Sequence, residues 1–223
     1  MEAVKPREPQ YAECFNAVPV TLGPMSSNAY RRDPKRLGFT LARYKFVSQM
    51  VRGFERVAEI GCADAFGSSV VREAVGILEL YDFDEAWRKP AEAATGCRFY
   101  CHDIRTRHLG GWSYEAIYML DVLEHIAPAD EPAVLRNVQL SLDTDGVFIA
   151  GCPSLESQVY ASSQSKIGHV NCRTGDELHS VMKRHFNNVF LFCMNDETLH
   201  VGFSPMAHYL LVVCTGPKVP HRK

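Results

Sequence analysis

Residues 57–67 read VAEIGCADAFG and decide the fold of this chain. The apolar run Val57 to Ile60 carries one acid, Glu59, near its end, and small residues then follow at every second position. This pattern predicts a buried parallel strand that turns sharply into a helix. Small residues in the turn let the backbone lie against a ligand, and a helix beginning near Phe66 would point its free N–H groups at that ligand. The segment therefore indicates a nucleotide-type cofactor site.

Strand and helix patterns alternate along most of the remaining chain. Apolar runs predict strands at 56–61, 76–81, 98–102, 116–120 and 147–151, and helical spacing or composition predicts helices at 40–51, 66–75, 84–95, 128–142 and 174–185. A turn is expected at 143–146, and the polar stretch 154–173 shows no strong periodicity. Two later apolar runs, 188–194 and 207–214, predict an antiparallel hairpin. The alternation favours right-handed βαβ units around a mostly parallel sheet of seven strands.

The chain divides into one large domain with short additions. Five prolines lie within residues 1–36, which indicates an irregular lead-in. We therefore expect an irregular N-terminal extension at 1–38 that could act as a lid, a catalytic domain at 39–216 and a C-terminal tail at 217–223.

Composition excludes several classes of function. The chain has 223 residues, a hydrophobic fraction of 46% and a formal net charge of −2, which argues against a general nucleic-acid partner. No apolar run is long enough to predict a membrane span, and the N-terminus lacks the apolar segment of a signal peptide. The eight cysteines include no CxxC pair, and most lie in apolar runs, so we expect free thiols and a cytoplasmic protein.

The turn after residue 60 discriminates between two cofactors. A dinucleotide site of the G-x-G-x-x-G type would need glycines at 61, 63 and 66, and only Gly61 meets this requirement. The same stretch resembles the first motif of the class I S-adenosylmethionine-dependent methyltransferases, acid-x-Gly-x-Gly-x-Gly, with Ala63 and Ala65 in place of two glycines. This family has a Rossmann-like, doubly wound α/β fold whose last strand is antiparallel and inserted beside its neighbour.

Further motifs follow in the order typical of that family. Tyr81-Asp82-Phe83-Asp84 ends the second strand, where the family places an acid on the ribose hydroxyls; Asp82 is the preferred candidate and Asp84 the alternative. His102-Asp103-Ile104 ends the third strand, where the family's Asp contacts the adenine. The resemblance implies S-adenosylmethionine as the cofactor, with contacts from Glu59, Gly61, Ala63, Asp82, Phe83, Asp103, Ile104 and Asp121. Arg43, in the preceding helix, could reach the methionyl carboxylate or lie at the surface.

A second constellation follows the fourth strand. Asp121-x-x-Glu124-His125, with His169 in the loop after the fifth strand, resembles the divalent-metal site of two methyltransferase groups. These are the RNA 3′-end 2′-O-methyltransferases and the ubiquinone-biosynthesis O-methyltransferases. The resemblance implies Mg²⁺ or Mn²⁺ bound by these four residues. The alternative is that Glu124 and His125 only cap a helix or hold a loop, and then His125 or His169 is a candidate general base.

We therefore expect an S-adenosylmethionine-dependent O-methyltransferase acting on a small polar acceptor such as a sugar, a sugar nucleotide or a secondary metabolite. Two alternatives stay open: N-methylation of a small molecule, and a non-catalytic regulatory protein with a cofactor fold. The two alanines at 63 and 65 are the sequence support for the latter. The sequence also leaves open whether the protein forms a homodimer.

Overall fold

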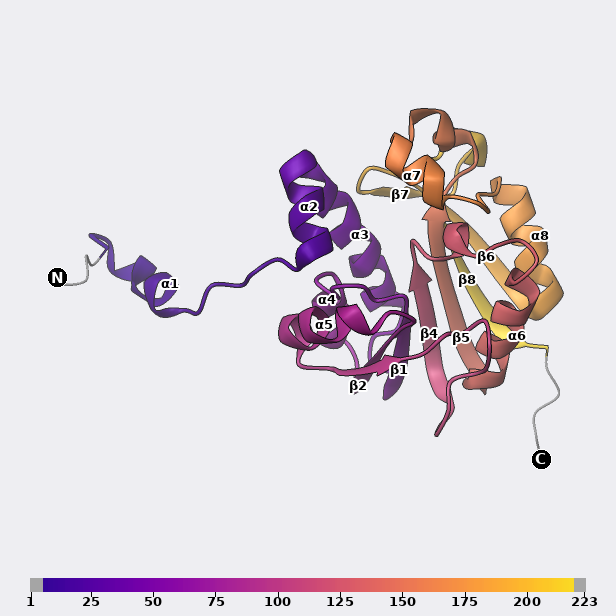
Figure 1. The fold of residues 1–223 in the computed structure, drawn as a ribbon, viewed down its shortest axis with the longest axis horizontal. Helices are drawn as coiled ribbons and strands as arrows, with labels where there is room; N and C mark the ends of the chain where they lie inside the picture. The colour runs from indigo at the N-terminus through magenta and orange to yellow at the C-terminus, as the bar shows by residue number, and fades with distance from the viewer. Residues whose placement is uncertain (1–5, 219–223) are drawn as a thin grey trace.

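A single eight-stranded sheet organises the protein, as a computed structural model of the chain shows for residues 6–218 (Figure 1). The strand order is β3-β2-β1-β4-β5-β8-β6-β7. The first five strands are parallel, and the last three pair antiparallel. The strands are β1 (Arg56–Ile60), β2 (Ile77–Asp82), β3 (Arg98–Cys101), β4 (Tyr114–Leu120), β5 (Leu142–Pro153), β6 (Phe186–Asn195), β7 (Thr198–His200) and β8 (Tyr209–Pro217).

Helices cover both faces of the sheet. One apolar layer holds side chains of α3, α4 and α5, and the other holds side chains of α6 and α8. The α-helices are α1 (Ala12–Asn16), α2 (Pro24–Arg32), α3 (Lys35–Met50), α4 (Ser68–Arg72), α5 (Arg88–Thr95), α6 (Glu131–Ser141), α7 (Ser163–Gly168) and α8 (Gly175–His185). The 3₁₀ helices are η1 (Pro9–Tyr11), η2 (Glu85–Trp87), η3 (Leu123–His125), η4 (Glu156–Tyr160) and η5 (Ser204–Met206). No helix within residues 6–218 is long and apolar enough to span a bilayer.

The order of the parallel strands reverses between β1 and β4. In open α/β sheets ligands bind at this reversal, outside the carboxyl ends of the strands. Gly61 directly follows β1 with a φ of 78°, and a Cβ at this position would lie 2.3 Å from a methyl carbon of Val122, which follows β4. Only glycine satisfies both the left-handed backbone and this close approach.

Ala63 and Ala65 adopt the left-handed backbone conformation that favours glycine. Their φ angles are 45° and 52°. The loop therefore keeps the path that glycines would take, although each alanine carries a methyl group that disfavours it. The substitutions seen in the sequence alter the energy of this loop rather than its course.

The N-terminal region differs from the irregular lead-in that the prolines predict. Within residues 6–36 it contains η1, α1 and α2, and α3 begins at Lys35 rather than near residue 40. Pro24 lies in the first turn of α2, where the missing N–H costs no hydrogen bond. Pro34 likewise precedes α3 as its N-cap. Pro24 and Pro34 therefore begin helices rather than interrupt them. Residues 1–5 lie outside the described part of the chain.

Other boundaries also differ. The turn expected at 143–146 lies inside β5, as an irregularity where the pairing with β4 shifts its register. The helix expected at 66–75 is limited to α4. The polar stretch after β5 contains η4 and α7, and β7 brings the sheet to eight strands instead of seven. Since β8 ends at Pro217, the expected C-terminal tail falls largely on residues 219–223, outside the described chain.

Candidate active site

The carboxylate of Glu59 lies inside the protein. Glu59 is 1% exposed, and its two carboxylate oxygens accept hydrogen bonds from the hydroxyls of Tyr44 (2.8 Å) and Tyr118 (2.6 Å). Burial raises the pKa of Glu59, while these donors favour the ionised form. The geometry gives this acid the role of joining α3 to β1 and β4 beneath the loop. Its expected contact with the cofactor stays a prediction.

Asp82 connects the loops that follow β1 and β2. One carboxylate oxygen accepts from the backbone N–H of Ala63 at 3.0 Å, and the other accepts from the backbone N–H of Asp84 at 3.1 Å. Burial raises the pKa of the Asp82 carboxyl. Each oxygen keeps a further lone pair, so Asp82 can accept from a vicinal diol while it holds the loop. Asp84, the alternative, instead caps η2 by accepting from the N–H of Ala86.

Of the residues expected near the adenine, Asp103 and Phe83 contact Arg105, whereas Ile104 lies in the core. Asp103 is held by Arg105, whose guanidinium donates to both carboxylate oxygens at 2.7–3.1 Å, and these hydrogen bonds lower the pKa of Asp103. The Arg105 guanidinium also lies 5.9 Å from the ring centroid of Phe83, which is 70% exposed. Ile104 belongs to the buried core, so its side chain serves packing.

An ion pair occupies the carboxyl end of β4. Nη1 of Arg43 lies 2.8 and 3.0 Å from the two oxygens of Asp121, and the guanidinium carbon lies 3.7 Å from the ring centroid of Tyr209. Nε of Arg43 is buried and has no hydrogen-bond partner. Asp121 has a φ of 56°, an unusual conformation that turns the chain at the strand end. Helix α3 therefore places a cation at the carboxyl end of β4.

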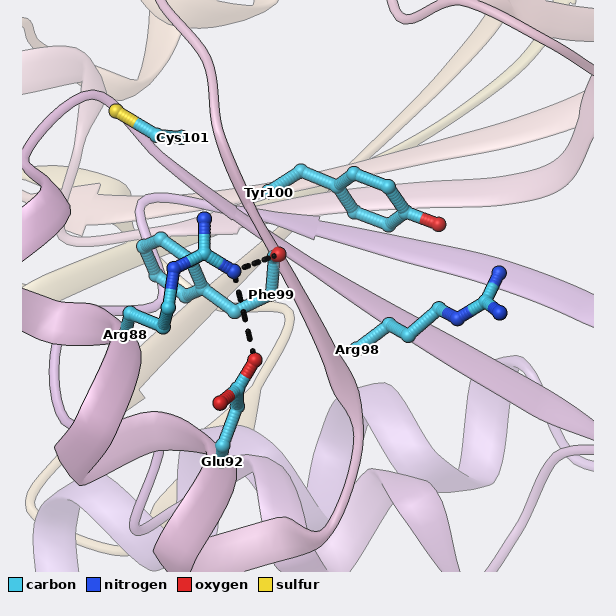
Figure 2. A pocket seen from close by; sticks show the side chains of 6 residues that line it. All are labelled: Arg88, Glu92, Arg98, Phe99, Tyr100 and Cys101. Carbon is cyan, nitrogen blue, oxygen red and sulfur yellow. Dashed lines mark hydrogen bonds and ion pairs between the residues drawn. The ribbon is translucent and has the colours of Figure 1, made fainter.

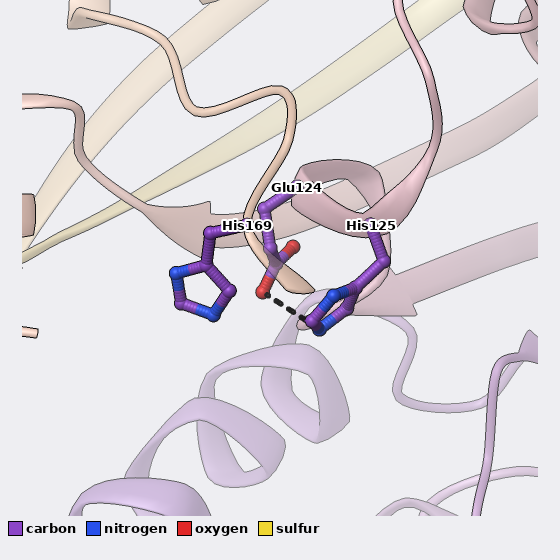
Figure 3. A group of neighbouring side chains, drawn as sticks. All are labelled: Glu124, His125 and His169. Carbon is purple, nitrogen blue, oxygen red and sulfur yellow. Dashed lines mark ion pairs between the residues drawn. The ribbon is translucent and has the colours of Figure 1, made fainter. Parts of the chain in front are cut away.

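Glu124, His125 and His169 converge, as Figure 3 shows. One ligand atom from each lies within 4.8 Å of the others, and a carboxylate oxygen of Glu124 lies 4.0 Å from Nε2 of His125. Asp121, the fourth expected ligand, is not in this group because Arg43 binds its carboxylate. We call Glu124, His125 and His169 the triad.

Hydrogen bonds orient both imidazoles of the triad. Nδ1 of His125 lies 2.9 Å from the carbonyl oxygen of Gly168, and Nδ1 of His169 lies 2.8 Å from the side-chain oxygen of Gln158. Because both partners are acceptors, each Nδ1 donates, and in a neutral ring Nε2 keeps its lone pair. Metal-bound histidines are held in this way by their second nitrogen.

Burial decides the electrostatics of the triad. The Glu124 residue is 1% exposed, one of its oxygens is buried without a partner, and burial together with Asp121 raises its pKa well above the ordinary value. Burial and the neighbouring His125 lower the pKa of His169. A neutral imidazole and an unsatisfied carboxylate oxygen are the donor set that a divalent cation satisfies.

Backbone hydrogen bonds hold the loop after β5 against Glu124 of the triad. The backbone N–H groups of Val170 and Asn171 donate to the carbonyl of Glu124 at 2.8 and 3.0 Å. Glu131 then accepts from the side chains of Asn171 (2.9 Å) and Arg173 (2.7 Å). Thr174, five residues beyond His169, caps α8 in a reciprocal capping box with Glu177. These hydrogen bonds therefore fix the position of the loop segment that carries His169.

Helix α2 forms long-range hydrogen bonds at both of its ends. At its beginning, the Asp64 carboxylate accepts from the backbone N–H (2.8 Å) and hydroxyl (3.0 Å) of Ser26. At its end, Nη1 of Arg32 donates to the side-chain oxygen of Gln164 in α7 at 2.6 Å. The helix thus connects the loop after β1 with the loop that carries His169, the place expected for a lid.

The sequence did not reveal these anchors. Pro24 after Gly23 was an available signal for α2, since Pro favours the first turn of a helix. The pairings Arg43–Asp121 and Gln158–His169 have no local signature, because each depends on how distant segments pack.

A separate surface hollow of about 510 Å³ lies at the sheet edge between α5 and β3 (Figure 2). Arg88 crosses it and donates to the carbonyl of Phe99 at 2.8 Å, with Glu92 at 3.4 Å. None of the predicted site residues lines the hollow, and Arg88 is already paired with Glu92 and the Phe99 carbonyl.

Comparisons with known proteins agree with this architecture at the level of fold. No protein-family model and no curated protein sequence matches the chain. Among solved structures, the N-methyltransferase NodS from Bradyrhizobium japonicum WM9, in complex with S-adenosylhomocysteine, is similar over 88% of this chain and 89% of its own, with 16% identity and a TM-score of 0.60.

Two further solved structures show the same likeness. The methyltransferase domain of bacterial CtHen1-C matches over 79% of this chain and 98% of its own, with 12% identity and a TM-score of 0.66. The plantazolicin methyltransferase BpumL, in complex with S-adenosylhomocysteine, matches over 86% and 88%, with 12% identity and a TM-score of 0.63. The protein therefore has the fold of the class I S-adenosylmethionine-dependent methyltransferases, which confirms the predicted fold class.

Proposed function

We propose that the protein is an S-adenosylmethionine-dependent methyltransferase that methylates an oxygen of a small acceptor at the triad. The observation that carries the choice of oxygen is the convergence of the buried Glu124 carboxylate with two imidazoles whose Nδ1 atoms are engaged elsewhere. A neutral amine attacks through its nitrogen lone pair and does not need such a site, whereas a hydroxyl is a poor nucleophile until it loses its proton.

The cofactor would lie across the carboxyl ends of the parallel strands. Asp82 is suited to the ribose hydroxyls, and exposed Phe83 offers a face for the adenine ring. Arg43 and Asp121 form an ion pair that a methionyl group can replace, because its carboxylate suits the guanidinium and its ammonium suits the Asp121 carboxylate. The unpartnered Nε of Arg43 supports this role.

The triad fits a divalent cation through Glu124, His125 and His169, with Asp121 available only if Arg43 moves away. Such an ion would act as a Lewis acid that lowers the pKa of an acceptor hydroxyl. In methyl transfer the acceptor hydroxyl would give its proton to water, and its oxygen would bond to the methyl carbon as the carbon–sulfur bond breaks and S-adenosylhomocysteine leaves. The chain's contribution is alignment, which brings reacting atoms together without a further entropy cost.

Without a metal ion, the same residues support a general-base mechanism. Since the pKa of His169 is lowered, its imidazole is neutral at neutral pH and its Nε2 can accept the hydroxyl proton. His125 offers the same nitrogen at a more exposed position. Activity that survives chelation would favour this route.

Two competing functions stay testable. The structural likeness to the N-methyltransferase NodS supports an amine acceptor as the second candidate. A non-catalytic role is supported by the methyl groups of Ala63 and Ala65 in the loop that approaches the cofactor.

The deciding experiment is calorimetric titration with S-adenosylmethionine, S-adenosylhomocysteine and NAD, repeated with Asp82→Ala. We expect binding of the first two ligands only, weakened in the variant by about 1–3 kcal/mol, the cost of a lost buried polar contact. Exposed Asp145→Ala is the matched control and should bind normally. No heat with either adenosyl ligand would reject the methyltransferase proposal, and a wild-type protein that binds no Mn²⁺, or that binds it no better than Glu124→Gln, would reject the metal.

A further inference from the structure

Large apolar side chains protrude from the loops that follow β5 and β7. They come from η4, from α7 and from the segment that leads into η5, and Tyr160 and Ile167 are 86% and 82% exposed. We call this set the apolar rim; its members are Val159, Tyr160, Ile167, Val201, Phe203 and Met206. Soluble proteins rarely expose so many large apolar groups together, and such patches mark interaction surfaces.

The rim lies beside the triad. Val159 and Tyr160 directly follow Gln158, which accepts from His169, and Ile167 directly precedes Gly168, which accepts from His125. Helix η4 also packs against η5, which brings the second half of the rim to the same end of the molecule. Figure 1 draws α7 and β7 at the same end of the molecule.

A cluster of cations adjoins the rim. It consists of exposed side chains at the junction of α2 and α3 and in α7: Arg31, Arg32, Lys35, Arg36 and Lys166. The bond from Arg32 to Gln164 holds α2 against α7, so the cluster and the rim share one end of the protein. Four acids lie at the same end: Asp33 accepts from the N–H of Lys35, Glu197 lies close to Gly38, Asp196 adjoins Glu197 in the turn after β6, and Glu156 lies in η4. Cations remain in excess, and we call this group the basic corner.

We propose that this end of the protein docks on the surface of an anionic lipid bilayer, with the rim inserted among the lipids and the basic corner against the headgroups. Apolar groups beside Lys and Arg are what binds such an interface, because insertion and electrostatic attraction add. The charge complementarity favours a bilayer over a second copy of this chain, whose own basic corner would repel. Docking itself does not depend on the proposed methyl transfer. Together with that function, it would place the triad next to acceptors that reside in the membrane.

The test is sedimentation of the full chain with vesicles of phosphatidylcholine alone or with about one third phosphatidylglycerol, at low and physiological salt. We expect binding to the anionic vesicles, at least about tenfold weaker at the higher salt. Ile167→Ser and Arg31→Glu should each weaken binding by about fivefold or more. Matched changes at exposed residues elsewhere, Phe190→Ser in β6 and Arg98→Glu in β3, should leave it unchanged.

Three results would overturn the proposal: no vesicle binding by the wild-type protein, equal losses in the rim variants and their controls, or a dimer in light scattering that Ile167→Ser dissociates. Circular dichroism and S-adenosylmethionine titration of every variant separate docking from folding and from cofactor binding. A variant that binds the cofactor normally and vesicles poorly supports docking alone.

Discussion

Replacing Ala63 by Gly should stabilise the protein, although the same change normally destabilises. Ala63 has a φ of 45°, and a left-handed backbone costs an L-residue about 1–2 kcal/mol. Glycine removes this cost but gives the unfolded chain more freedom, which costs about 0.5–1 kcal/mol. The net expectation is about 0.5–1 kcal/mol of added stability. At Ala65 the lost burial of one methyl group, about 0.8 kcal/mol, should reduce the gain to near zero.

Urea unfolding at 25 °C, followed by circular dichroism, measures the difference. Ala93→Gly is the matched control, because Ala93 is exposed in α5 and should lose about 1 kcal/mol as a helical residue. If Ala63→Gly destabilises the protein as much as the control does, the loop is not strained in the way the backbone angles indicate. The argument that alanine preserves the course of this loop at an energetic cost would then be refuted.

Two further predictions concern the buried acids. Tyr118→Phe removes a donor from Glu59 and should cost about 1–3 kcal/mol of stability in the same urea assay, whereas Tyr160→Phe at an exposed position should change it by less than about 0.5 kcal/mol. Mn²⁺ binding should release protons to an extent that grows as the pH falls, because burial and Asp121 raise the pKa of Glu124 and a bound ion displaces its proton. The affinity should also fall as the pH drops below about 6.5, because His169, whose pKa burial and His125 lower, gains a proton only in that range. Calorimetry in buffers of different ionisation enthalpy measures both effects, and a pH-independent affinity with no proton release would contradict them.

The sequence by itself determined the arrangement of the parallel strands and the sheet edge at which the candidate site lies. Buried strands read as continuous apolar runs, and the acids that follow them must meet at one edge because parallel strands end together. The convergence of Glu124, His125 and His169 was therefore predictable from resemblance and strand order. The N-terminal helices were not, because proline both interrupts helices and begins them, and only the packing of α2 on Asp64 shows which applies here.

Only the tertiary structure decided which of these acids remain available to contact a ligand. Glu59 and Asp121 look equivalent to Asp82 in the sequence, yet Tyr44 and Tyr118 enclose the first and Arg43 holds the second. Arg43 and Asp121 are 78 residues apart, so no local pattern records their contact. A side chain's partners depend on which surfaces meet after the helices pack on the sheet, and that is fixed by burial over the whole domain rather than by any short segment.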